Sequence, residues 1–139
     1  MHSQLFAPLV VMVLWTFVMC AWLYATRIPA ISRLKIVFDP TKPDADFHAQ
    51  LPPQVRWKAD NYNNLMEQPI LFYAVILTLA PLGADGVLNL ALAWAYVAAR
   101  VVHSLIQATT NIVLVRFSAF MVGTLILLAL TVRAALLVF

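Results

Sequence analysis

The sequence predicts an all-α integral membrane protein that forms one four-helix bundle over residues 1–139. Of the 139 residues, 63% are hydrophobic and only 11% are charged, which is too apolar for an ordinary soluble domain of this length. A helix needs about 20 mostly apolar residues to cross a bilayer. Four segments are expected to span, at about residues 5–26, 58–82, 86–108 and 112–138. They take up most of the chain, so we expect no separate soluble domain.

The basic residues predict the orientation of these spans. Six of them lie around the first connection, namely Arg27, Arg33, Lys35, Lys42, Arg56 and Lys58, whereas the second connection, APLGADG, contains no lysine or arginine. Cytoplasmic loops carry the excess of positive charge, so the loop at about residues 34–55 is expected in the cytoplasm and both termini on the other side. The net charge of +3 is not spread as a nucleic-acid-binding surface, and we expect no nucleic acid partner.

The first span is expected to be a retained helix rather than a cleaved signal peptide, because MHSQ lacks a basic leader. Pro29 is expected to kink or end it. The following loop contains four prolines and three aspartates, which predicts an irregular segment over the cytoplasmic end. His48 lies in this loop without a second ligand nearby, so no metal site is expected.

The second span carries polar groups into the membrane. Arg56, Asp60, Asn64 and Glu67 follow one another at steps of four, four and three, which places them on one helix face. A carboxylate inside the bilayer costs about 2.5 to 3.5 kcal/mol, so Glu67 should face protein or a wet cavity. Pro69 should distort the helix beside it.

The third span carries a second polar stripe, at Tyr96, Arg100, His103, Gln107 and Asn111. A buried guanidinium needs a carboxylate or several acceptors, and Glu67 is the only acidic residue inside the apolar part of a span. We therefore expect Glu67 to contact Arg100. Asp85 is expected to cap this helix, and Arg133 in the fourth span to extend to the membrane surface.

Together with Arg116 on the first turns of the fourth span, these side chains should meet in the cytoplasmic half. Polar groups in membranes often only hold helices together, and that interpretation stays open here. The excess of positive donors over Glu67 favours a site for an anionic ligand.

The segment NLMEQPILFYA in the second span, with Arg100, His103, Gln107, Asn111 and Arg116 after it, resembles the MAPEG family, the membrane-associated proteins in eicosanoid and glutathione metabolism, and in particular its short bacterial members. The resemblance implies a homotrimer in the bacterial inner membrane that binds glutathione as co-substrate between subunits near the cytoplasmic face. It implies a transferase or peroxidase that acts on lipophilic small molecules arriving from the membrane lipid.

The resemblance also implies roles for single residues. Asn64 and Glu67 would hold the glutathione backbone, Glu67 through the amino group. Arg116 would be the catalytic residue that stabilises the thiolate. The remaining residues expected to line the glutathione site are Arg33, Arg56, Arg100, His103 and Gln107.

Two departures from the family pattern keep an alternative open. Asp60 stands where many members have an arginine, and Gln107 where tyrosine or histidine is usual. Both favour a non-catalytic membrane subunit that keeps the fold and binds a protein partner or lipid. An exporter of cationic drugs is disfavoured by the positive charges around Glu67, and a haem protein by the single histidine within a span.

Overall fold

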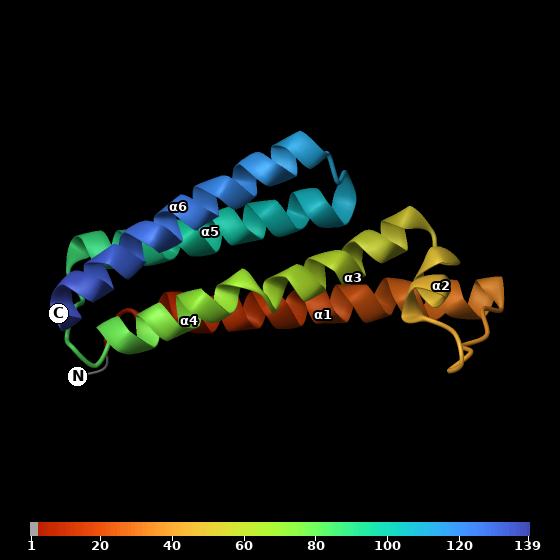
Figure 1. Cartoon of the computed structure of the whole chain (residues 1–139), viewed down its shortest axis with the longest axis horizontal. Coiled ribbons are helices and arrows are strands. Elements are labelled where there is room, and N and C mark those ends of the chain that lie inside the picture. Colours follow the sequence, from red (N-terminus) through yellow and green to blue (C-terminus); the bar gives the residue numbers. More distant parts are fainter. Residues whose placement is uncertain (1–2) are drawn as a thin grey trace.

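The computed structural model describes residues 3–139, and every regular element in this part of the chain is a helix. The helices are α1 (Phe6–Leu34), α2 (Asp44–Ala49), α3 (Pro53–Leu65), α4 (Gln68–Leu79), α5 (Val87–Thr109) and α6 (Val113–Val138). The prediction of an all-α protein is confirmed. In Figure 1, α3 and α4 follow one another along α1, and α5 lies beside α6. The start of α1 and the end of α6 lie at one end of the molecule and α2 lies at the other.

Within residues 3–139, three helices are long and apolar enough to cross a membrane, namely α1, α5 and α6. Helices α5 and α6 begin and end within one residue of the expected spans. The expected second span is divided, because α3 ends at Leu65 and α4 begins at Gln68. The distortion predicted beside Glu67 is therefore a complete break in the helix.

Helix α1 continues beyond the first expected span at its C-terminal end. It does not end at Pro29 but continues to Leu34, where Lys35 closes it in a left-handed conformation with φ 50°. Proline removes the hydrogen bond to the carbonyl four residues earlier, here Ala25, yet membrane helices tolerate this when neighbouring groups compensate. The helix therefore extends past Pro29 into the connection that leads to α2.

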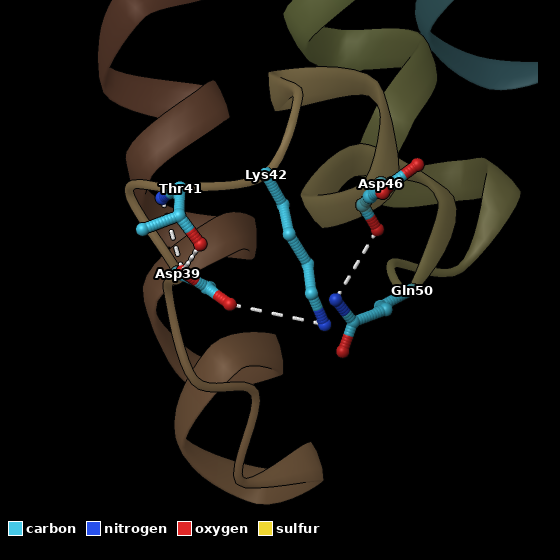
Figure 2. Close-up of polar contacts among 5 residues, drawn as sticks. All are labelled: Asp39, Thr41, Lys42, Asp46 and Gln50. Atoms are coloured by element: carbon cyan, nitrogen blue, oxygen red, sulfur yellow. Dashed lines mark hydrogen bonds and ion pairs between the residues drawn. The ribbon is translucent and has the colours of Figure 1, made fainter.

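The loop after α1 is more ordered than its prolines suggest. It contains the short helix α2, which is held to α1 by the Arg27 guanidinium 5.3 Å from the centre of the Phe47 ring. Figure 2 shows the polar contacts of this loop. The Asp39 carboxylate accepts hydrogen bonds from the Thr41 hydroxyl at 2.7 Å and the Thr41 N–H at 3.0 Å, and these bonds lower the pKa of Asp39 below its usual value.

Helix α5 lies at the centre of the packing, against α1, α3 and α6. The interior changes character with depth. Toward the termini it is apolar, with Met12, Phe72, Ile76 and Leu130 fully buried. Toward the α5–α6 connection it is polar, with buried side chains from α3 and α5 that include Lys58, Asn61, Arg100, His103, Ser104 and Gln107. The polar stripe of the third span is therefore a buried face, and it is where the candidate site lies.

The expected cap of α5 is wrong. Asp85 does not cap α5, whose first residue follows Gly86 without a side-chain cap. It accepts hydrogen bonds from the Ser3 hydroxyl and the Gln4 N–H, so it joins the start of the chain to the α4–α5 connection. Arg133, near the other end of α6, donates its Nε–H to the Asn89 side chain on α5.

Candidate functional site

A pocket of about 280 Å³ opens between α3, α5 and α6, near the α5–α6 connection. We call it the inner pocket. Its lining residues are Asn64, His103, Gln107, Val113, Arg116, Phe117 and Phe120. Four of these are residues that the sequence analysis assigned to the site. They come from three helices because α3 and α5 turn their polar faces toward each other and α6 starts directly after α5.

Asn64 is the centre of the polar contacts. Its side-chain oxygen accepts a hydrogen bond from Arg100 Nη2 at 2.6 Å, and its backbone oxygen lies 3.3 Å from the same nitrogen. Its side-chain nitrogen donates to Glu67 Oε2 at 3.3 Å. The amide thus has its oxygen toward the cation and its nitrogen toward the anion.

The predicted direct contact between Glu67 and Arg100 is therefore wrong. No ion pair joins them, and Asn64 lies between the two charges. The break between α3 and α4 is the physical reason. Glu67 occupies it with φ −94° and ψ −91°, so its side chain leaves the helix face and is exposed, whereas Arg100 is completely buried.

Several buried polar atoms behind the inner pocket have no hydrogen-bond partner in the described chain. They are Nε and Nη1 of Arg100, Nδ1 of His103 and Oε1 of Gln107. The Phe120 ring lies near two of these residues, 5.7 Å from the Arg100 guanidinium and 5.9 Å from the His103 ring centre. Unpartnered buried donors are costly, and a guanidinium in particular calls for an anionic acceptor.

Arg116 lies on the first turn of α6 and is half-buried at the pocket wall. Its Nη1 donates to the Asn111 side-chain oxygen at 2.5 Å. Asn111 is in the short connection between α5 and α6 with φ 49°, a left-handed conformation that asparagine tolerates better than most residues. The connection thereby fixes one edge of the guanidinium, and the remaining N–H groups are free to meet a ligand.

A second pocket of about 470 Å³ lies beside the inner pocket, toward α2. We call it the outer pocket. It is lined by His48, Arg56, Trp57, Asp60, Asn63 and Asn111. Arg56, one of the expected glutathione-binding residues, is therefore next to the inner pocket but not in it.

Arg33 is the one expected site residue that the structure places apart from the others. It lies in a mostly apolar groove between α1 and the start of α3, with Pro29 and Val55, and its side chain is exposed. Within one chain, then, Asn64, His103, Gln107 and Arg116 share the inner pocket, Arg100 and Glu67 join them through Asn64, and Arg33 is separate.

Sequence reasoning missed a clamp made by Gln68. Its Nε2 donates to the Thr124 hydroxyl on α6 at 2.8 Å, and its Oε1 accepts from the Tyr96 hydroxyl on α5 at 3.3 Å. Gln68 is the first residue of α4, so the clamp holds the helix break against both neighbouring helices. The sequence signal that could have indicated this role is the position of Gln68, a polar residue directly between Glu67 and Pro69 in an otherwise apolar span. Phe117 and Phe120 were also missed, because nothing in the sequence around them distinguishes a phenylalanine that lines a pocket from one that faces lipid.

Metal ligands do not gather at either pocket. Across residues 3–139, no three His, Cys, Asp or Glu side chains are grouped so that they could hold a metal ion. The polar atoms of the site are amides, guanidinium groups and an imidazole, which suit an anionic or zwitterionic organic ligand.

Comparison with known proteins gives one match. The sequence model of the MAPEG family matches residues 5–136, nearly the whole chain. Searches of the curated proteins and of the solved structures gave no match.

Proposed function

The chain belongs to the MAPEG family, and from this membership we propose that it is a membrane-embedded, glutathione-dependent transferase or peroxidase acting on lipophilic electrophiles. Three apolar helices and the family support an integral membrane protein. The inner pocket supports the choice of co-substrate, because its unpartnered donors suit a small peptide with carboxylate groups.

The observation that carries the proposal is the convergence of cationic and amide groups on one pocket. Arg116 lines the inner pocket, and Arg100 lies completely buried behind Asn64 with its Nε and Nη1 unpartnered. Glutathione has two carboxylates, one ammonium and a thiol, so it would add the negative charge that this arrangement lacks. Polar groups that served only to hold the helices together would be hydrogen-bonded to one another, and buried donors without a partner would not be needed.

The chemistry follows from the position of Arg116. A thiol such as that of cysteine has a pKa near 8.5, and only the thiolate is a good nucleophile. A permanently charged guanidinium in a partly dehydrated pocket favours the charged form and lowers that pKa. The thiolate sulphur then bonds to an electrophilic carbon, either displacing a leaving group as an anion or adding to an activated double bond whose carbanion takes a proton from water. With a lipid hydroperoxide, the sulphur bonds to the terminal oxygen as the O–O bond breaks, which gives a sulfenic acid and an alkoxide that takes a proton from water to become the alcohol. A second glutathione then converts the sulfenic acid to the disulfide and water.

The second substrate would come from the bilayer. Val113 and Phe117 line the inner pocket and are themselves exposed on the outside of α6. In a membrane this outer surface faces lipid or a neighbouring subunit. A lipophilic molecule could therefore reach the thiolate without crossing water.

The same proposal includes the assembly. Helices α3 and α4 together have 25 residues, from 13 and 12, a length of roughly 38 Å, so they would form the fourth crossing of a four-helix bundle. Glu67 and Arg33 are exposed in the single chain, and a charged group at membrane depth needs cover. A homotrimer in the bacterial inner membrane, with both termini outside the cytoplasm, would supply that cover.

The test is the melting temperature of the detergent-purified protein at increasing glutathione concentration. A ligand that binds only the folded state stabilises it by RT ln(1 + [L]/Kd), so we expect a saturable rise. Oxidised glutathione and the dipeptide Cys-Gly are the controls. Absence of a shift at millimolar glutathione would exclude the proposed co-substrate.

A non-catalytic subunit of the same fold is the second candidate. It is favoured by Gln107, which contributes an amide to the inner pocket where a titratable or aromatic side chain is usual. One further assay distinguishes the enzyme from the non-catalytic subunit. Glutathione binding without turnover of any lipophilic electrophile or hydroperoxide would favour the subunit that binds a protein partner or lipid.

A further inference from the structure

The outer pocket contains opposite charges that do not neutralise each other. Arg56 and Asp60 lie one turn apart on α3 and both line it. Residues four apart on a helix are close enough to pair, yet these two form no ion pair. Here the cation precedes the anion in the sequence, which is the less favourable order for such pairs.

Neither charged side chain is paired within the described chain. Nε of Arg56 is buried and has no hydrogen-bond partner, and the Asp60 side chain is exposed. A pocket with a separated cation and anion suits a ligand that carries both charges itself. Asn63, His48 and the Trp57 ring complete its walls.

The outer and inner pockets are lined by neighbouring residues of the same helix and the same connection. Asn63 lines the outer pocket and Asn64, the next residue, lines the inner pocket. On the other side, Asn111 of the outer pocket accepts the hydrogen bond of Arg116 in the inner pocket. A tripeptide reaches roughly 10 Å when extended, so one molecule could place its thiol in the inner pocket and one end in the outer pocket.

We propose that the outer pocket binds the α-amino acid end of the γ-glutamyl group, with its ammonium on Asp60 and its carboxylate on Arg56. This inference rests on the proposed function, since it assumes that the thiol of the same ligand lies beside Arg116. It reassigns the amino group from Glu67, which lines neither pocket and already accepts a hydrogen bond from Asn64.

The assignment makes Asp60 a specificity-determining residue. An arginine at this place would attract only a carboxylate, whereas Asp60 beside Arg56 selects a ligand with both charges. A tripeptide that lacks the ammonium would leave the Asp60 carboxylate facing the ligand's own negative charge. Such a ligand should bind more weakly to this chain.

The test compares glutathione with glutaryl-cysteinyl-glycine, which is the same molecule without the amino group. Binding to the purified full-length protein is measured by calorimetric titration in the same detergent. We expect the wild type to prefer glutathione by about tenfold or more. In Asp60→Asn the preference should fall to about twofold or less, and Arg56→Gln should weaken both ligands.

Two further variants make the comparison decisive. Asp44→Asn changes an exposed carboxylate on α2 outside both pockets, so it should keep the wild-type preference. Glu67→Gln tests the competing carboxylate. If the preference survives in Asp60→Asn and is lost in Glu67→Gln, the assignment is overturned while the proposed function stands. If glutathione does not bind the wild type at all, the proposed function itself fails.

A phosphatidylethanolamine headgroup also pairs an ammonium with an oxyanion, so the melting temperature is measured with this lipid in mixed micelles. We expect no rise that depends on Asp60. A rise from the lipid alone that is lost in Asp60→Asn, with an unchanged peptide preference, would assign the outer pocket to lipid instead.

Discussion

At the scale of single residues, Asn64 connects two charges that sequence spacing alone would join directly. Its amide oxygen is 2.6 Å from Arg100 Nη2, and its amide nitrogen is 3.3 Å from Glu67 Oε2. An amide that bonds a cation and an anion at once is held in one orientation, since exchange of its oxygen and nitrogen would lose both bonds. Asn64 therefore orders this part of the site before any ligand binds.

The first prediction compares the effect on stability of substituting Asn64 with the effect of substituting Glu67. Asn64→Ala removes the side-chain acceptor of a completely buried guanidinium, so the free energy of unfolding should fall by about 1.5 to 3 kcal/mol. Glu67→Gln keeps an acceptor at an exposed position, so its effect should stay within about 0.5 kcal/mol. Thermal unfolding without ligand measures both. Asn63→Ala, the adjacent exposed amide, is the matched control. A larger loss in Glu67→Gln than in Asn64→Ala would restore the direct pairing of Glu67 with Arg100.

The second prediction concerns Arg116. Arg116→Ala should keep the fold and leave glutathione affinity within a few-fold, because Asn64 and Arg100 remain. It should abolish the ultraviolet absorbance of bound thiolate and lower any turnover by roughly 100-fold, the usual cost of losing one charge-stabilising group. Arg116→Lys should retain part of the absorbance. Equal thiolate absorbance in Arg116→Ala and wild type would remove Arg116 from the mechanism.

At the scale of elements, the break between α3 and α4 sets the geometry of the site. Pro69 cannot donate a backbone hydrogen bond and is buried at the start of α4. Gln68 beside it holds α4 to α5 and α6. An uninterrupted helix would keep Glu67 on the face of Arg56 and Asp60, as the spacing predicts, whereas the break sends it outward.

Pro69→Ala tests this role of the break. The alanine N–H can bond the Leu65 carbonyl, so α3 and α4 should join and the Asn64 and Glu67 side chains should shift. We expect glutathione affinity to fall about tenfold while stability without ligand is unchanged or higher. Pro8→Ala, at a buried proline in the first turn of α1, should leave affinity unchanged. Unaltered affinity in Pro69→Ala would show that the break does not position the site.

The comparison of prediction with structure separates two kinds of information. Apolar length and the 3.6-residue period predicted the helical fold and the buried polar stripe on α5, because both depend on one helix at a time. The partners of Glu67, Asp85 and Arg133 could not be predicted, since each depends on side-chain positions in another helix. Asp85 meets Ser3 across 82 positions of sequence, and no local pattern encodes that distance.

At the scale of the whole molecule, polarity is arranged by depth. The apolar interior lies toward the two termini, and the polar interior with both pockets lies toward α2 and the α5–α6 connection (Figure 1). With the basic residues gathered at the same end as the pockets, the protein would present its site to the cytoplasmic face of the membrane.

The fourth prediction tests that orientation with single cysteines, after Cys20→Ala removes the native thiol. Asp44→Cys on α2 should react with a membrane-impermeant thiol reagent only in opened inner-membrane vesicles. A cysteine added after Phe139 should react in cells whose outer membrane alone is permeable. The reverse pattern would place the pockets on the non-cytoplasmic side and contradict the orientation given by the basic residues.

Asn111 shows how closely folding and chemistry are linked in so short a chain. It turns α5 into α6 with a positive φ, accepts the hydrogen bond of Arg116 and lines the outer pocket. Glycine would suit the turn but offers no acceptor, and aspartate would accept the bond but add a charge that competes with a thiolate for Arg116. Few other amino acids would therefore be acceptable at position 111 during evolution. A new ligand preference would arise more readily by substitution of Asp60, which lies within α3 and has no role in a turn.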